Sequence, residues 1–141
     1  MQSNPALART LLRRYGWNAT AYQIVNPGIS HWFDPKGDAV IGFVKVGRVR
    51  VVAGAPVCPE ERLEEVVALW ESEAERAHEG VCYFGAAGRL NTLFEQTGKH
   101  SFVVLGAQPV WDPARWVETI ESRASLRAQL ARAKNKGVTV H

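Results

Sequence analysis

The chain of 141 residues contains no apolar run close to the length of a membrane span. A helix that crosses a bilayer needs about 20 consecutive apolar residues. Residues 1–5 also lack the basic stretch and the apolar stretch of a secretory signal. These absences predict a soluble, cytoplasmic protein.

Cysteine is scarce, and the two cysteines, Cys58 and Cys82, form no Cys-x-x-Cys pair. No histidine stands near them at the spacing of a zinc site. Both are therefore expected to be small buried hydrophobic residues in a reducing compartment. The sequence predicts no metal site and no cofactor.

The sequence also lacks a recognisable nucleophile. No serine lies in a Gly-x-Ser-x-Gly setting, and the four histidines are scattered over positions 31, 78, 100 and 141. A catalytic triad is not expected, and no catalytic residue is assigned. We expect His31, beside Trp32, to be a surface or packing residue, and His78 to interact with a helix dipole.

Charge of one sign does not dominate, since 17 Lys and Arg oppose 14 Asp and Glu and the formal net charge is +3. Hydrophobic residues make up 46% of the chain and charged residues 22%, as in ordinary globular proteins. No internal repeat is visible. At this length about 68% of the surface of the unfolded chain can be buried, which is enough for one core.

The first residues of the chain carry the signals of a helix. Asn4 is suited to cap a helix, Pro5 to occupy its first position and Gly16 to follow its end, which predicts a helix over residues 5–14. Its apolar face is expected to carry Leu7, Leu11 and Leu12.

A longer helix should begin at Pro59 and run to about residue 78, with Gly80 as its stop signal. A short helix over residues 89–96 should end before Gly98. The apolar stripe of the longer helix is Leu63, Val66, Val67, Trp70, Ala74 and Ala77.

Valine-rich segments predict the strands. Residues 39–46 and 48–53 alternate partly with polar residues and are separated by Gly47, which indicates an antiparallel hairpin. Residues 81–84 are expected to form a buried strand. The remaining expectations are strands over residues 21–25 and 101–105, a short segment over 29–33, and turns at 26–28 and 34–38. Lys45, Arg48 and Arg50 are expected to face solvent.

The resulting order of helices and strands predicts an α/β protein, with a mixed sheet flanked by helices. This order is compatible with a GNAT-like acyltransferase fold. The five tryptophans are expected to pack mainly in the core rather than stack on nucleic-acid bases. They are Trp17, Trp32, Trp70, Trp111 and Trp116.

The C-terminal part of the sequence is basic, with five Lys or Arg and no acid from Arg123 onward. Spacing of four places such side chains on one helix face, where they could bind phosphates of tRNA or lipid; a solvated helix face or linker is the alternative. Leu126, Leu130 and Ala133 are expected to dock another face of this helix on the sheet. The predicted anion-binding residues are Arg123, Arg127, Arg132, Lys134 and Lys136.

Gly137 should end this helix, and the apolar residues that follow suggest a further strand. We therefore expect a domain over residues 1–120 and a basic linker helix over residues 121–141 that leads toward a second half.

Several segments together resemble the catalytic domain at the C-terminus of phosphatidylglycerol lysyltransferases. The resemblance extends from about residue 12 to residue 140. It lies in Tyr15-Gly-Trp-Asn18, Gly54-Ala-Pro-Val-Cys58, Cys82-Tyr-Phe-Gly85, Gly106-Ala-Gln-Pro-Val-Trp-Asp112 and Leu126-Arg-Ala-Gln-Leu-Ala-Arg-Ala-Lys-Asn-Lys-Gly137.

The resemblance implies the first of two GNAT-like halves of an aminoacyl-tRNA-dependent transferase. Such an enzyme moves an aminoacyl group from aminoacyl-tRNA to a lipid hydroxyl, and a soluble relative could use a small-molecule acceptor instead. The chemistry is expected mainly in the second half. Ala55 stands where the family pattern more usually has Asp, which removes a carboxylate from that turn.

Two other interpretations remain open. Residues 50–55 are the nearest match to the pyrophosphate cradle of an acyl-CoA-dependent N-acetyltransferase, but the glycine comes one position too late. Alternatively, the chain is a noncatalytic module whose uncovered basic helix and sheet edge bind a partner or pair with a second copy as a homodimer.

Overall fold

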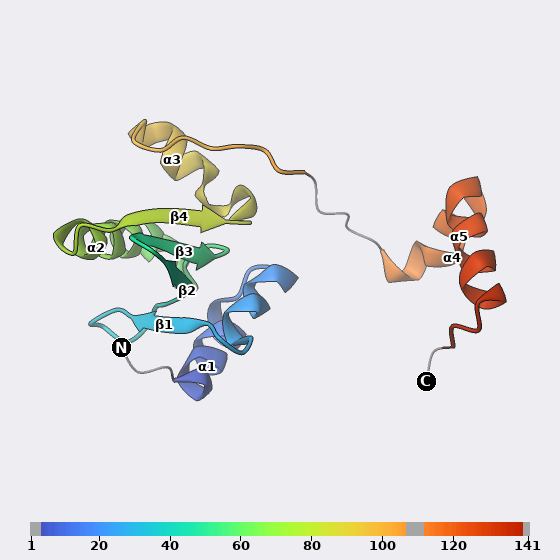
Figure 1. Cartoon of the computed structure of the whole chain (residues 1–141), viewed down its shortest axis with the longest axis horizontal. Coiled ribbons are helices and arrows are strands. Elements are labelled where there is room, and N and C mark those ends of the chain that lie inside the picture. The colour runs from blue at the N-terminus through green and yellow to red at the C-terminus, as the bar shows by residue number, and fades with distance from the viewer. Residues whose placement is uncertain (1–3, 107–111, 140–141) are drawn as a thin grey trace. The chain divides into compact units, whose positions relative to one another are not determined.

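The computed structural model describes residues 4–106 and 112–139 (Figure 1). The chain divides into two compact units, Met1–Ser101 and Phe102–His141, and each is described by itself. Within the described ranges no helix is long and apolar enough to cross a membrane. The predicted boundary at residue 120 between a domain and a linker helix stays a prediction.

The first helix, α1, spans Pro5–Tyr15, as its end signals predict. The Asn4 side chain accepts a hydrogen bond from the backbone N–H of Leu7 at 3.1 Å. A Cβ on Gly16 would lie 2.5 Å from the carbonyl oxygen of Leu12, so the chain can pass the helix end this closely only at glycine. The buried residues of α1 are Ala8, Leu11 and Leu12. Leu7 is 37% exposed and does not belong to the buried face.

The predicted strand over residues 21–25 is wrong, because the segment forms a 3₁₀ helix, η1, at Ala19–Val25. The Asn18 side chain accepts a hydrogen bond from the N–H of Ala21 at 3.0 Å. Ala21 and Ile24 lie one 3₁₀ turn apart, and both are buried. The periodicity of so short an apolar run does not distinguish a helix from a strand. Here the hydrogen bond to the Asn18 side chain favours the helix.

The second α-helix, α2, spans Leu63–Arg76 and follows a short 3₁₀ turn, η2, at Glu60–Arg62. Glutamates in its first turn favour the positive end of the helix dipole. Its buried residues are Leu63, Val66, Val67, Trp70 and Ala74, which confirms the predicted stripe except for the exposed Ala77.

The end of α2 is made by His78, which takes the left-handed conformation with φ 55°. The N–H of His78 donates to the carbonyl oxygen of Glu75 at 2.8 Å, and the N–H of Glu79 donates to that of Ala74 at 2.9 Å. These two bonds form a Schellman motif, in which glycine usually takes the left-handed position. His78, and not Gly80 as predicted, therefore ends the helix.

Four strands form one sheet, and they span Ser30–Phe33 (β1), Val40–Val46 (β2), Val49–Ala53 (β3) and Gly80–Phe84 (β4). The order is β1-β2-β3-β4, in which β1, β2 and β3 are antiparallel and β3 and β4 are parallel. The predicted hairpin across Gly47 is confirmed. The carboxylate of Asp34 accepts hydrogen bonds from the N–H groups of Lys36, Asp38 and Ala39 and thereby shapes the β1–β2 turn.

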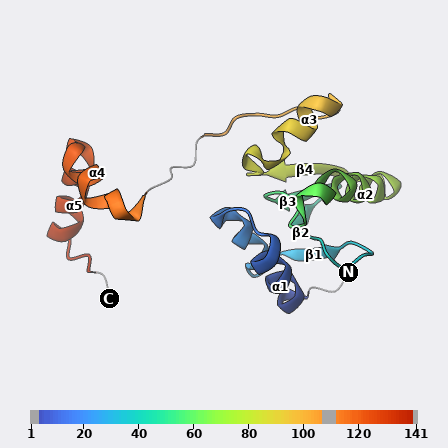
Figure 2. The same cartoon turned by 180° about the vertical axis from the view of Figure 1, so that it is seen from behind.

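The sheet is covered on both faces, as alternate residues of β2 show. Ile41 and Phe43 belong to the core beneath α2, where the rings of Phe43 and Trp70 lie 4.8 Å apart. Between them, Gly42 faces η1, and a Cβ there would lie 2.6 Å from the Cβ of Ile24. Because successive strand residues point to opposite faces, α2 covers one face and the α1–η1 layer the other (Figure 1, Figure 2). The predicted mixed sheet flanked by helices is confirmed.

Strand β4 forms where predicted, but it is a half-exposed edge strand and not a buried one. Tyr83 is partly buried, whereas Cys82 and Phe84 are exposed. The prediction that both cysteines are buried is therefore right for Cys58 and wrong for Cys82. After β4 the chain forms a 3₁₀ turn, η3, at Ala87–Leu90 and a helix, α3, at Asn91–Thr97. The left-handed Gly98 ends α3, as predicted.

The second unit contains the main error of the sequence prediction. Residues 102–105 form no strand, and Phe102, Val103, Val104 and Leu105 are exposed. An apolar run becomes a strand only when a neighbouring strand completes its hydrogen bonds, and the described residues supply none. The remaining elements are η4 at Pro113–Arg115, α4 at Trp116–Ser122 and α5 at Ala124–Asn135. Trp111, predicted to be in the core, lies outside the described residues.

Candidate functional site

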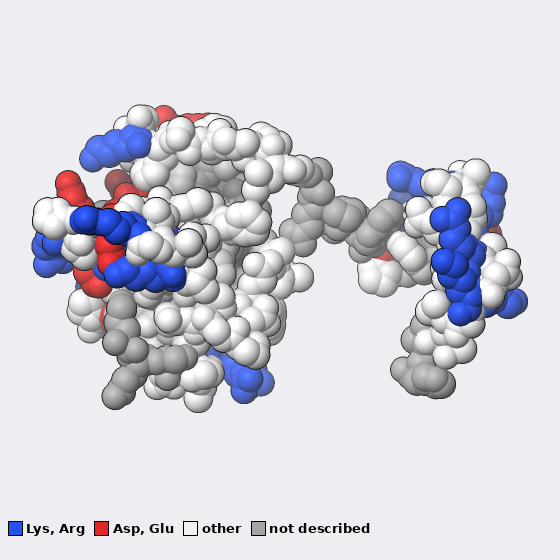
Figure 3. Space-filling view, in the orientation of Figure 1, with Lys and Arg blue, Asp and Glu red and all other residues white. Residues whose placement is uncertain are grey.

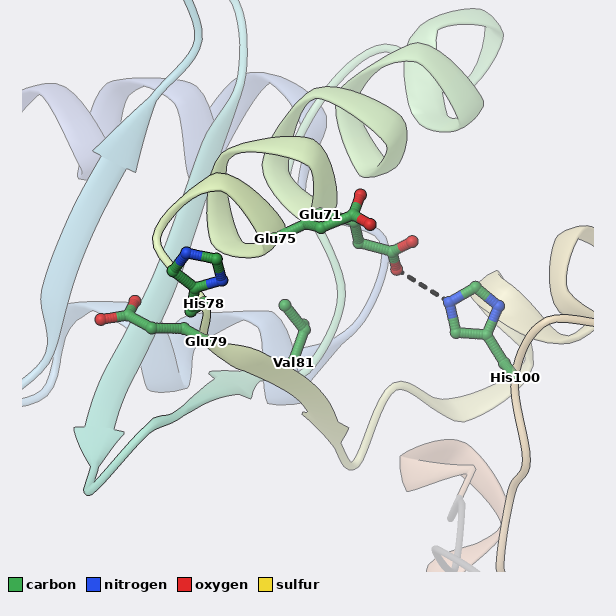
Figure 4. A pocket seen from close by; sticks show the side chains of 6 residues that line it. All are labelled: Glu71, Glu75, His78, Glu79, Val81 and His100. Carbon is green, nitrogen blue, oxygen red and sulfur yellow. Dashed lines mark hydrogen bonds and ion pairs between the residues drawn. The ribbon is translucent and has the colours of Figure 1, made fainter.

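The first unit contains an acidic hollow of about 430 Å³ between the end of α2, the start of β4 and the segment after α3 (Figure 4). Three glutamates and two histidines line it together with one valine. These residues are Glu71, Glu75, His78, Glu79, Val81 and His100.

The end of α2 supplies most of the lining. Glu71 and Glu75 are four residues apart and therefore lie on the same face of the helix. His78 and Glu79 enter the hollow because the Schellman motif turns the chain back toward β4 at this point. His100 comes from the opposite side, and Figure 4 shows its ring directed toward the Glu71 carboxylate.

Glu71 connects the two sides of the hollow. Nε2 of His100 lies 2.8 Å from Oε1 of Glu71, and the hydroxyl of Tyr83 donates to the same oxygen at 3.0 Å. Burial raises the pKa of Tyr83 well above its usual value, and the charge of Glu71 raises it further. Tyr83 therefore stays a neutral donor that fixes the carboxylate.

The ring of His100 is held by stacking on Phe94, with the ring centroids 3.7 Å apart and the planes 15° from parallel. Its other nitrogen, Nδ1, is buried and has no hydrogen-bond partner among the described residues. When Nε2 carries the proton toward Glu71, Nδ1 presents a lone pair that can accept a proton. Stacking on Phe94 and the contact with Glu71 thus fix the orientation of the His100 ring.

Glu79 is neutralised by two cations. Hydrogen bonds from Lys45 and Arg50 lower the pKa of Glu79, and Nε of Arg50 donates to Oε2 of Glu79 at 2.6 Å. Arg50 also lies 4.6 Å from the ring centroid of Trp70 and pairs with Glu73 at 3.3 Å. The negative charge of the hollow therefore comes mainly from Glu71 and Glu75.

The prediction that Arg50 faces solvent is wrong, because this residue is 6% exposed. Its side chain points toward α2, where the ring of Trp70 covers the guanidinium. Glu73 on α2 and Glu79 in the turn after it compensate the charge. The acyl-CoA cradle over residues 50–55 stays a prediction. Most of that segment is strand β3, and no helix begins directly after it.

The predicted anion-binding residues lie in the second unit, in and around α5. Arg127, Arg132 and Lys134 lie in the helix, Arg123 precedes its first residue, and Lys136 follows its last. Figure 3 shows lysine and arginine side chains gathered over this part of the chain. The guanidinium of Arg127 donates to the carbonyl oxygen of Glu121, so one of the five cations also holds the α4–α5 junction.

Helix geometry divides these cations into two rows. At 100° per residue, Arg132 is rotated by about 140° from Arg127, whereas Lys134 is rotated by only about 20° from it. Arg127 and Lys134 therefore share one side of α5, and Arg132 shares the other with Lys136. No residue of α5 is buried, so docking of Leu126, Leu130 and Ala133 on the sheet stays a prediction.

Sequence reasoning missed the acidic hollow. Glu71 and His100 are 29 positions apart and belong to no motif, so only the fold brings them together. The one available signal was the spacing of Glu71 and Glu75 on a helix whose other face is apolar. Among the described residues, no group of three or more His, Cys, Asp or Glu is arranged to hold a metal ion.

The fold is shared with solved structures of two related proteins. The structure of L-PGS from Bacillus licheniformis is 23% identical, with a TM-score of 0.59, and the match covers 67% of this chain and 29% of that one. The C-terminal domain (DUF2156) of a proposed lysylphosphatidylglycerol synthetase from Agrobacterium fabrum is 20% identical, with a TM-score of 0.58, and the match covers 67% and 30% of the two chains. The chain thus has the mixed α/β fold of a part of these proteins.

The family model of the phosphatidylglycerol lysyltransferase C-terminal domain matches residues 9–141. The chain therefore belongs to the family of that domain, which confirms the resemblance seen in the sequence. No match was found among the curated proteins. The chain spans less than a third of the length of the two solved structures.

Proposed function

We propose that the chain is the amino-terminal, GNAT-like half of an aminoacyl-tRNA-dependent aminoacyl transferase. The observation that carries this proposal is the family match over residues 9–141. The two related structures are much longer than the part that the chain covers, which supports a role as one portion of a larger catalytic unit.

The charges of the two candidate surfaces support the same function. Lys and Arg side chains on α5 suit phosphates of a tRNA or of a lipid headgroup. The acidic hollow suits a cationic group, such as the ammonium of an aminoacyl substrate, because Glu71 and Glu75 lack the cations that neutralise Glu79. Each surface thus matches a different charged portion of an aminoacyl-tRNA.

Binding to aminoacyl-tRNA tests the proposal. The chain and a variant with Arg123, Arg127 and Arg132 all changed to alanine are titrated at about 50 mM and 200 mM salt. Loss of three phosphate contacts should remove a salt effect of roughly 20- to 40-fold on the dissociation constant. Vesicles of phosphatidylglycerol in phosphatidylcholine replace the tRNA in a second series.

A matched control carries the same change of charge elsewhere. Arg9, Arg13 and Arg14 are exposed on α1, and their replacement by alanine should leave both titrations unchanged. Equal loss of binding in both variants would indicate a general charge effect and not an α5 surface. No binding of the unaltered chain at low salt to either probe would exclude the substrate-binding role.

A second candidate function is self-association as a noncatalytic module. It is favoured by the edge position of β4, which among the described residues pairs with β3 alone, and by the exposed apolar residues at 102–105. Sedimentation equilibrium over a range of protein concentrations separates the two functions. A concentration-dependent dimer that Val103→Lys abolishes would support this candidate, and a monomer at all concentrations would exclude it.

A further inference from the structure

We propose that Arg89 and the indole of Trp17 form a binding site for a phosphate-type oxyanion. The site lies in the first unit, away from the basic helix α5 in sequence and from the residues that line the acidic hollow. It goes beyond the proposed transferase function, because it is derived from the surroundings of these two side chains alone.

The site is built where two parallel strands end. Arg89 lies in η3, directly after β4, and its guanidinium carbon lies 4.7 Å from the ring centroid of Trp17. The backbone N–H of Gly54, just after β3, donates to the carbonyl oxygen of Phe84 at 2.8 Å. The carboxyl ends of β3 and β4 thus meet beside Arg89, and in open α/β sheets ligands bind outside this end of the strands.

Two donors at this place have no acceptor in the part of the chain that the structure describes. The indole Nε1 of Trp17 and the Nε of Arg89 are both buried, and neither has a hydrogen-bond partner among the described residues. The hydrogen bond of Arg89 to protein oxygen runs from Nη2 to the carbonyl of Cys58 at 2.8 Å. Buried donors are normally satisfied, so these two donors, on side chains whose guanidinium carbon and ring centroid lie 4.7 Å apart, indicate an acceptor that comes from outside the chain.

The charge of Arg89 also lacks compensation. Within the described ranges Arg50 and Arg62 have carboxylate partners, whereas no ion pair involves Arg89. A carbonyl oxygen and a tryptophan face stabilise a guanidinium only in part. A partly buried cation without a counter-ion favours a negatively charged ligand over a neutral one.

These requirements together select an oxyanion. The ligand must accept hydrogen bonds from an indole and a guanidinium, carry negative charge, and need no donor of its own. A phosphate group meets all three conditions, and arginine binds it with charge-assisted hydrogen bonds. A water molecule would satisfy the donors but leave the charge of Arg89 uncompensated.

The test uses the indole N–H signals of the chain in a ¹H–¹⁵N spectrum, in which each of the five tryptophans gives its own peak. Inorganic phosphate is titrated at constant ionic strength, with chloride as the balancing anion. The peak of Trp17, assigned by its disappearance in Trp17→Phe, should move downfield and saturate. Vesicles of phosphatidylglycerol form a second arm, which distinguishes a lipid phosphate from a free one.

Variants connect this signal to the site. Arg89→Gln should weaken the phosphate-dependent shift by about tenfold or more, because a charge-assisted hydrogen bond is lost. Arg9→Gln makes the same change of charge on the exposed surface of α1 and should leave the shift unchanged. If Arg89→Gln does not fold, Arg89→Lys keeps the charge but not the Nε donor, and it should bind phosphate more weakly than the unaltered chain.

Three results would overturn the proposal. The first is a Trp17 peak that does not respond to phosphate or to the vesicles. The second is an equal response to chloride alone, which would show ionic screening and no bound oxyanion. The third is an unchanged shift in folded Arg89→Gln, which would place the anion elsewhere.

Discussion

The two units of the chain differ in what supports their helices. α1 has 11 residues and buries Ala8, Leu11 and Leu12 against the sheet. α5 has 12 residues and a similar stripe of alanines and leucines, yet none of its residues is buried. An isolated helix of about 12 residues is marginally stable in water. Within the described residues, α1 is supported by buried contacts with the sheet, whereas α5 lies against α4 with no residue buried.

Replacing one leucine by alanine in α1 and one in α5 should distinguish a helix that is buried against the sheet from a helix that is exposed. Leu12 is 2% exposed and Leu130 is 48% exposed. Leu12→Ala should lower the free energy of unfolding by about 2–5 kcal/mol, because it leaves a cavity, and Leu130→Ala should change it by less than about 0.5 kcal/mol. Urea denaturation followed by tryptophan fluorescence measures both. A large loss of stability in Leu130→Ala would mean that α5 is packed after all.

A tight contact in the first unit gives the next largest effect. A Cβ on Gly42 would overlap the side chain of Ile24, which packs η1 onto β2. Gly42→Ala should therefore lower the free energy of unfolding by about 1–3 kcal/mol through overpacking. Gly88→Ala is the matched control, since nothing lies within 4 Å of its Cβ position. Equal stability of the two variants would show that η1 can move away from the sheet.

The contrast between local and distant signals also explains how much the sequence predicted. α1 was predicted correctly because its cap and its stop lie within the segment itself. The strand at residues 101–105 was predicted wrongly because a strand requires a neighbour that no local pattern reveals. Arg50 was misplaced for the same reason, since its carboxylate partners come from α2 and the turn after it.

The candidate sites follow this rule as well. The cations of α5 were readable because they are close in sequence. The contacts of Glu71 with His100 and of Arg89 with Trp17 join segments far apart in the chain, and neither pair matches a spacing motif. Such sites depend on sheet order and on how helices cross the strands, which residue patterns do not specify.

The helix ends provide a smaller comparison, because α2 and α5 close with the same motif. The left-handed residue is His78 in α2 and Gly137 in α5. His78→Gly should raise the free energy of unfolding by about 0.4–1 kcal/mol, because glycine adopts this conformation without steric cost. Thermal unfolding followed by circular dichroism measures the change. His78→Asn should give a smaller gain, and destabilisation by both changes would mean that the His78 side chain itself holds the turn.

The smallest expected effect compares exposed ion pairs in the two units. Hydrogen bonds from Arg62 and Lys36 lower the pKa of Glu65 to about 2 from 4.5, and Arg115 lowers the pKa of Glu118. A carboxylate with a lowered pKa stabilises the folded state above its unfolded pKa, and this contribution is lost as the pH falls from about 4.5 toward 2. The side chains of Glu65 and Glu118 are 44% and 66% exposed, so each contribution is small.

Carboxyl chemical shifts followed against pH measure both pKa values directly. Arg62→Gln should move the titration of Glu65 toward 4.5, and Arg115→Gln should do the same for Glu118. Because Glu65 has two cationic partners and Glu118 has one, the Arg62 variant should keep part of its shift through Lys36, whereas the Arg115 variant should keep none. Equal residual shifts would show that Lys36 makes no contribution to the lowered pKa of Glu65.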